Sequence, residues 1–156
     1  MHSRIFQVST KPIVKEDYIE ESNYYDHWFT NSIADYVSDN CERDYDIQWL
    51  KDCYSTKGIE FGIDDNGEYL IIKSKEEYFQ NAFNRFQKLL DKIKAYNLKH
   101  FIEGIDEMWE LKNEYEEKYG FYIESEEYDL ITIDDFIRCC NVNEKYYIGA
   151  TIDYHC

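Results

Sequence analysis

Alternation of apolar and polar residues predicts that the chain begins with a β-strand. In residues 3–9, SRIFQVS, Phe6 and Val8 share one face while Gln7 lies on the other. This period of two residues is typical of a strand with one buried face. We expect the strand to end near Lys11-Pro12, since proline has no backbone N–H to donate to a sheet.

Further strands are predicted in the middle and at the end of the chain. Residues 59–73 read as a β-hairpin, because two β-rich segments flank Asp65-Asn66-Gly67 and an Asn-Gly pair suits turn positions with φ > 0. Residues 121–125 and 129–133 have the composition of short strands, and residues 145–156 that of a longer one. Gly149 is expected to form a β-bulge in this last strand.

Helical spacing of apolar residues predicts several helices. Trp28 or Phe29, Ile33, and Tyr36 or Val37 indicate a helix within residues 26–39, and a second short helix is expected over 46–51. The strongest helix signal follows Ser74, which forms a capping box with Glu77. Its apolar stripe consists of Phe79, Phe83, Phe86, Leu90 and Ile93.

A further helix is predicted from about Ile105 to Tyr119, between Gly104 and Gly120. Its apolar side is expected to anchor it to the core and consists of Met108, Trp109, Leu111, Tyr115 and Tyr119. A last short helix is predicted over residues 133–140. Hairpin turns and short connections favour an α+β fold: an antiparallel sheet of about five strands, including the 59–73 hairpin, packed with three to five helices.

Composition predicts that residues 1–156 form a single compact acidic domain. The 44 % hydrophobic and 18 % aromatic content argue against disorder, and one proline and six glycines leave little material for a linker. No apolar run indicates a signal peptide or a membrane span. Five cysteines without a secretory signal favour reduced thiols in the cytoplasm of a bacterial host cell. Abundant Ile, Tyr, Lys and Asn are typical of AT-rich genes, including those of phages and mobile elements.

The net charge of −16 is concentrated in two segments. Residues 16–46 carry −9 and residues 103–135 carry −11, whereas residues 74–102 carry +3. Such a chain repels nucleic acids and anionic membranes, so neither direct nucleic-acid binding nor membrane binding is expected. Instead, the charge favours association with a basic protein surface.

The predicted partner-binding site lies in the second acidic segment. Six of its carboxylates recur every three or four residues along residues 103–117, and these residues are Glu103, Asp106, Glu107, Glu110, Glu114 and Glu117. The site continues with acidic residues and tyrosines that would supply contact area, namely Tyr115, Tyr119, Tyr122, Glu124, Glu126, Glu127, Tyr128 and Asp129. A plainer interpretation is a solvated helix face that pairs with Lys88 and Lys92 of the preceding helix.

The charge pattern favours an acidic inhibitor that imitates nucleic acid. It would occlude the basic groove of a nuclease or another nucleic-acid-processing enzyme, as an anti-CRISPR or anti-restriction protein or a toxin-immunity protein would. One alternative is a small enzyme or ligand-binding domain that uses His27, the tyrosines or a carboxylate pair. Another is an acidic structural or adaptor protein with an apolar partner surface.

Candidate catalytic and metal-binding groups are weak in this sequence. The adjacent pairs Glu126-Glu127 and Asp134-Asp135 do not share a helix face, and adjacent Cys139-Cys140 is poorly spaced for zinc. Residues 64–68 resemble the start of a calcium loop but lack its acidic spacing. We therefore expect a protein that is not an enzyme and that requires no metal or cofactor.

Overall fold

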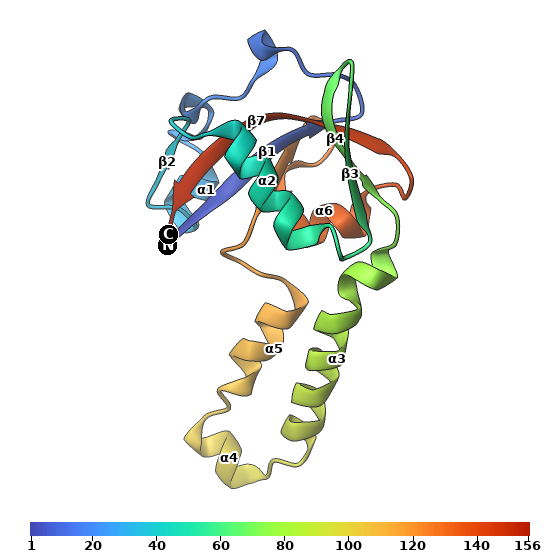
Figure 1. The fold of residues 1–156 in the computed structure, drawn as a ribbon. Helices are drawn as coiled ribbons and strands as arrows, with labels where there is room; N and C mark the ends of the chain where they lie inside the picture. Colours follow the sequence, from blue (N-terminus) through green and yellow to red (C-terminus); the bar gives the residue numbers. More distant parts are fainter.

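The computed structural model describes residues 1–156 as a sheet-based body from which a helical arm projects (Figure 1). The strands are β1 (His2–Ser9), β2 (Tyr36–Ser38), β3 (Ile59–Asp64), β4 (Gly67–Ile72), β5 (Tyr122–Ser125), β6 (Asp129–Thr132) and β7 (Lys145–His155). The α-helices are α1 (Trp28–Ser32), α2 (Arg43–Tyr54), α3 (Lys75–Lys94), α4 (Leu98–Glu103), α5 (Glu107–Tyr115) and α6 (Ile133–Cys139), with 3-10 turns η1 (Lys15–Asp17) and η2 (Glu21–Tyr24). We call α3, α4 and α5, residues 75–115, the arm, and the rest of the chain the body.

The predicted α+β class is confirmed, with seven strands instead of about five and one more α-helix than the upper expectation. The sheet has the order β3-β4-β7-β1-β5-β6, and β2 pairs with the end of β7. Every strand pair is antiparallel except β1–β5, which is parallel. None of the helices combines the length and apolar character needed to cross a membrane.

A β-bulge at Gly149 places apolar side chains of β7 on one face of the sheet before the bulge and on the other face after it. Phe6 pairs with Thr151 and Val8 with Ile148, so two residues of β7 lie opposite Gln7. The extra residue reverses the alternation: Ile148 points into one apolar cluster and Ile152 into the other. A Cβ at position 149 would lie 2.5 Å from the Gln7 Oε1, which explains the glycine. The predicted bulge is thus confirmed.

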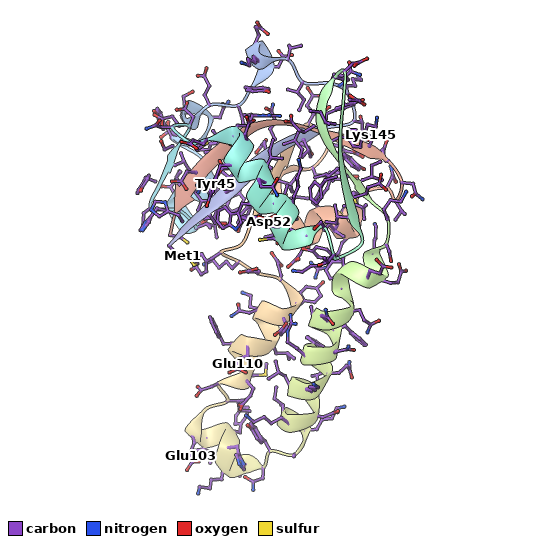
Figure 2. All side chains as sticks on the ribbon, viewed as in Figure 1. Met1, Tyr45, Asp52, Glu103, Glu110 and Lys145 are labelled. Carbon is purple, nitrogen blue, oxygen red and sulfur yellow. The ribbon has the colours of Figure 1, made fainter.

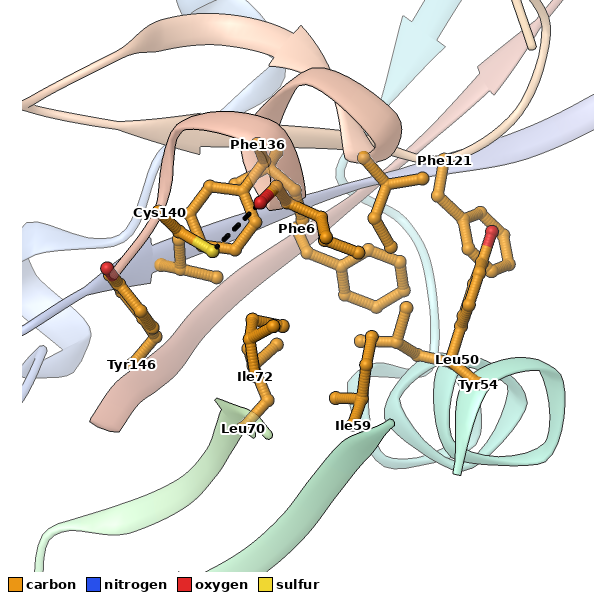
Figure 3. Packing of buried hydrophobic residues seen from close by; sticks show 14 of the residues in the cluster. Phe6, Leu50, Tyr54, Ile59, Leu70, Ile72, Phe121, Phe136, Cys140 and Tyr146 are labelled. Atoms are coloured by element: carbon orange, nitrogen blue, oxygen red, sulfur yellow. Dashed lines mark hydrogen bonds between the residues drawn. The ribbon is translucent and has the colours of Figure 1, made fainter. Parts of the chain in front are cut away.

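Two apolar clusters hold the body together, one on each face of the sheet. The larger cluster lies between the sheet, α2 and α6, and Figure 3 shows Phe6, Phe136 and Ile72 within it. The rings of Phe6 and Phe121 meet edge to face with centroids 5.4 Å apart, a favoured aromatic geometry. The smaller cluster is centred on Phe29 of α1, whose ring contacts the rings of Tyr122 and Tyr154.

A buried ion pair fastens α2 to the sheet. Asp46 is fully buried; it accepts hydrogen bonds from Arg4 Nε at 2.6 Å and from Thr151 Oγ1 at 2.9 Å. Arg4 also pairs with Asp153 and lies over the Trp49 ring. Because every charged group of this network has a partner, its burial is compatible with a stable core.

The hairpin and the start of α3 form where the sequence predicts them. Strands β3 and β4 pair from Ile59–Ile72 to Asp64–Gly67, and Gly67 has φ 117°, a value that favours glycine. The Ser74 hydroxyl accepts a hydrogen bond from the Glu77 backbone N–H at 3.1 Å and thereby caps α3. Only Tyr78 of α3 is buried in the body, so the helix leaves the body after its first turn.

Two helix predictions are wrong in extent. The segment 26–39 forms only the short helix α1 and then β2, because its last apolar residues pair with the end of β7. The helix predicted from Ile105 to Tyr119 spans only Glu107–Tyr115, and Gly120 does not terminate it. In contrast, strands β5 and β6 and helix α6 are confirmed.

Candidate protein-binding surfaces

The predicted acidic stripe of α5 is partly neutralised by α3. Lys92 and the Tyr96 hydroxyl contact Glu107, and these bonds lower the pKa of its carboxyl group to about 2. Arg85 Nε donates to both oxygens of Glu114 at 2.8 Å, which raises the pKa of the guanidinium group. Of the expected pairings with Lys88 and Lys92, only the one with Lys92 is observed. Glu107 and Glu114 thereby connect the helices of the arm.

The other acidic residues of this stripe are dispersed. Glu103 lies at the end of α4, 3.7 Å from Lys99, while Asp106 and Glu110 are exposed. Figure 2 shows Glu103 and Glu110 on the arm, at a distance from the body. Glu117 lies beyond the end of α5 and next to the body, where burial and the charge of Asp134 raise the pKa of its carboxyl group.

The expectation that α5 is anchored to the core by its apolar side is wrong. Met108, Trp109 and Tyr115 are exposed, and α5 contains no buried residue. The helix packs on α3, with Leu111 among its less exposed residues, and the pair extends away from the sheet (Figure 1). Helical periodicity identifies an apolar face, but it does not specify whether the core covers that face.

The four predicted tyrosines have different environments. Tyr115 is exposed below the Arg138 guanidinium group, 4.2 Å from the ring centroid, and Tyr119 is exposed beside Lys118. Tyr122 is only 3 % exposed, and its hydroxyl donates to the Lys118 carbonyl oxygen. Tyr122 therefore lies beneath the surface and offers almost no contact area to a partner.

Tyr128 and the acidic residues that follow β5 remain at the surface. Tyr128 packs its ring against Phe136, and burial raises the pKa of its hydroxyl to about 12. Glu126 and Glu127 are exposed in the turn between β5 and β6. Asp129 is exposed with φ 56°, a left-handed conformation that aspartate adopts more readily than most residues.

The fold joins the two acidic segments around one hollow of the body. A hollow of about 520 Å³ between η1 and the end of β5 is lined by Asp17 of the first segment and Glu124 and Glu126 of the second, together with Lys11. We call the following residues the acidic surface: Asp17, Glu124, Glu126, Glu127 and Asp129. None of them takes part in the ion pairs of the chain.

Gln7 holds the first acidic segment against the sheet, a role that the sequence did not reveal. Its Nε2 donates to the Asp17 carbonyl oxygen at 2.8 Å, and its Oε1 accepts from the backbone N–H groups of Ile19 and Ala150. The Tyr24 hydroxyl adds a hydrogen bond of 3.2 Å to Glu124. These contacts, all made to residues distant in sequence, could not be inferred from a local pattern.

Burial and the charge of Asp129 raise the pKa of Glu124 to about 7, from an ordinary value of 4.5. Burial and the charge of Glu124, which accepts the Tyr24 hydroxyl hydrogen bond, also raise the pKa of Tyr24. Both shifts follow first from burial, which disfavours the charged form, and then from the nearby negative groups. Glu124 is therefore only partly ionised at neutral pH, and it gains negative charge as the pH rises above 7.

The alternative catalytic residues have structural partners. His27 Nδ1 accepts from the Phe29 backbone N–H at 3.3 Å and thus caps α1. Asp134 accepts from the Tyr78 hydroxyl and from the Glu117 backbone N–H, while Asp135 forms an ion pair with Arg138. These contacts stabilise helix ends and the base of the arm.

The cysteines and the predicted hairpin turn show no metal-binding arrangement. All five cysteines are free thiols, and no three His, Cys, Asp or Glu side chains form a group that could hold a metal ion. Asp64 accepts from Lys145 Nζ at 2.7 Å and from the Asn66 backbone N–H, as expected for a hairpin turn.

Sequence reasoning missed the apolar residues that the arm exposes around its end. Leu98, Phe101 and Ile102 of α4 are 72–75 % exposed, and Trp109 of α5 is 69 % exposed. Their spacing after Asn97 is helical, so a short amphipathic helix was detectable; its exposure was not.

In three comparisons with known proteins, the chain matches no family model, no curated protein and no solved structure.

Proposed function

We propose that this protein is an acidic inhibitor that binds the basic groove of a nuclease or another nucleic-acid-processing enzyme and excludes the nucleic acid. The observation that carries the proposal is the convergence of two distant acidic segments around one hollow of the body. This arrangement leaves five carboxylates without ion-pair partners on one region of a protein whose net charge is −16. Anti-restriction, anti-CRISPR and toxin-immunity proteins are the functional classes in which such a surface would act.

The body is the stronger candidate for the charged contact. The arm contains seven Lys or Arg residues and eight Asp or Glu residues, a net charge of −1, which leaves −15 for the body. Moreover, Glu107 and Glu114 are already paired with cations of α3. A basic partner would therefore experience the strongest attraction toward the body, and this attraction would raise the association rate at low salt.

The partner can be identified by capture from a bacterial lysate at low salt, elution with a salt gradient, and mass spectrometry. The captured enzyme is then assayed with its nucleic-acid substrate over a range of inhibitor concentrations. We expect inhibition that competes with the substrate and weakens as the salt concentration rises. Binding without inhibition, or inhibition that excess substrate does not relieve, would contradict occlusion.

Charge reversal at exposed positions tests which surface makes the contact. Asp17→Lys, Glu126→Lys and Glu127→Lys together should abolish inhibition, because they replace attraction by repulsion on the acidic surface. The matched control is the arm triple variant Glu103→Lys, Asp106→Lys and Glu110→Lys, which changes the net charge equally and should retain inhibition. Reversal at Glu114 or Glu117 is less informative, since these residues contact Arg85 and the Asp134 region.

A further inference from the structure

The end of the arm exposes an apolar patch that the proposed charged contact does not use. We call the following residues the apolar tip: Leu98, Phe101, Ile102, Met108 and Trp109. Each is more than half exposed, although the same chain buries comparable side chains in two clusters of the body. Contiguous apolar patches of this kind are uncommon on monomeric proteins and typically mark interaction sites.

The backbone of the tip is well formed, so this exposure does not result from a frayed helix end. Asn97 caps α4 by accepting from the Lys99 backbone N–H at 3.0 Å, and Gly104 ends the helix with φ 105°. Tyr96 stacks on His100 with ring centroids 4.5 Å apart and donates to Glu107 at 2.7 Å. The turn between α3 and α5 is therefore held in a defined conformation.

Charge is segregated between the two sides of the arm. Helix α3 carries five Lys or Arg residues against three Asp or Glu residues, a net charge of +2. Residues 98–115 carry two against five, a net charge of −3. Lys88 and Lys94 are exposed on the first side, and Lys94 lies 3.1 Å from Asp91. Glu103 and Glu110 are exposed on the second side, and Glu103 lies 3.7 Å from Lys99. An arm is thus complementary in charge to a second arm related to it by a two-fold axis.

We propose that the arm is a dimerisation element that packs against the arm of a second copy of this chain. The apolar tips form the centre of the contact, and α3 of each copy lies beside the acidic side of the other. A second copy fits better than a strongly basic partner, because the arm has almost no net charge and presents both signs. The body, with −15, is where a basic partner is attracted instead.

The size of the patch agrees with this occupant. Five large apolar side chains that are 54–75 % exposed offer an apolar area on the order of 700 Å². A standard stable interface buries about 800 Å² per partner, so the tip and its charged margins are sufficient. Two bodies with the same negative charge would remain at opposite ends of the joined arms, since α3 alone is about 30 Å long.

Sedimentation velocity at several protein concentrations tests the dimer. From about 1 to 100 μM, the chain should change from one mass of 19.0 kDa toward twice that mass. Phe101→Glu should raise the dissociation constant at least about 30-fold, because it places a charge at the centre of the contact. A protein that remains monomeric over this range would overturn the proposal and assign the apolar tip to a different protein.

The matched control is Ile63→Glu, which removes an equally exposed apolar side chain from the body hairpin. It should leave the dissociation constant unchanged, and circular dichroism should show that both variants are folded. If Phe101→Glu dimerises as strongly as the control, the tip is not the interface.

A charge exchange tests the orientation of the two arms. Lys88→Glu with Lys94→Glu, and separately Glu103→Lys with Glu110→Lys, should each weaken self-association. In each variant, both sides of the arm carry charge of the same sign. When the two variants are mixed, each basic side can lie against an acidic side, so a mixed dimer should form. If the mixture stays monomeric while the unchanged protein dimerises, the proposed pairing of α3 with the acidic side is contradicted.

Discussion

The body and the arm use the same residue types in opposite ways. In the body, aromatic and aliphatic side chains fill two clusters, while the carboxylates of the acidic surface have no ion-pair partner. In the arm, two carboxylates pair with cations of α3, and the large apolar side chains of the tip face solvent. Acidic residues that look alike in a composition therefore differ in the folded protein. Their ion-pair partners determine which carboxylates are free to bind another protein.

Truncation of an aromatic ring should give the largest difference in stability loss between the body and the arm. Phe136→Ala in the body should lower the free energy of unfolding by about 3–5 kcal/mol, through lost burial and a cavity. Phe101→Ala in the arm should change it by less than about 0.5 kcal/mol, because the ring is 73 % exposed. Urea denaturation measures both. Should Phe136→Ala not fold, Ile137→Val should still cost about 0.5–1.5 kcal/mol.

Removal of one partner of an ion pair should also distinguish the regions. Asp46→Ala removes the acceptor of Arg4 and Thr151 but leaves Arg4 paired with Asp153, and we expect a loss of about 2–3 kcal/mol. Glu114→Ala breaks a pair whose arginine is 58 % exposed and should cost only about 0.2–1 kcal/mol. Equal losses in thermal or urea denaturation would show that the arm is held as tightly as the body.

The raised pKa of Glu124 predicts a pH-dependent stability of the body. An acid with a higher pKa in the folded state binds its proton more tightly there than in the unfolded chain. Stability should therefore fall as the pH rises from about 4.5 through about 7. Glu124→Gln should remove about 1–2 kcal/mol of this difference between pH 5 and pH 8, a value reduced for partial exposure. An unchanged pH dependence in the variant would contradict the assignment.

The lowered pKa of Glu107 predicts a smaller effect of opposite sign in the arm. An acid whose folded pKa is depressed stabilises the protein above its unfolded pKa of 4.5, and this contribution is lost as the pH falls toward 2. The protection factors of the α5 amides, which correct for the pH dependence of intrinsic exchange, should fall over this range, and Glu107→Gln should already lower them at neutral pH. Glu103→Gln, at a more exposed pair, serves as the control.

The sequence predicted those elements that local signals define. The Asn66-Gly67 turn, the Ser74 cap and the alternation around Phe6 correspond to the hairpin, the start of α3 and β1. It could not predict the parallel pairing of β1 with β5 or the three-residue strand β2, which depend on contacts between distant segments.

The sequence shows that the protein is rich in acidic residues, but it does not show which of them form a common surface. Glu107 and Glu126 look alike in the sequence, yet one pairs with Lys92 while the other lines the hollow beside Asp17. The apolar face of α5 predicted a contact with the core, whereas the turn at Asn97 directs the helix along α3. Only the tertiary arrangement separates these cases.

The most direct test of this division of roles is the salt dependence of binding to the captured nucleic-acid enzyme. We would measure the dissociation constant at several salt concentrations for the unchanged protein, the acidic-surface triple variant and the arm triple variant. We expect a steep loss of affinity with salt for the unchanged protein and the arm variant, and weak, nearly salt-independent binding for the acidic-surface variant. The reverse result, in which only the arm variant loses affinity and salt dependence, would place the charged contact on the arm and contradict the account.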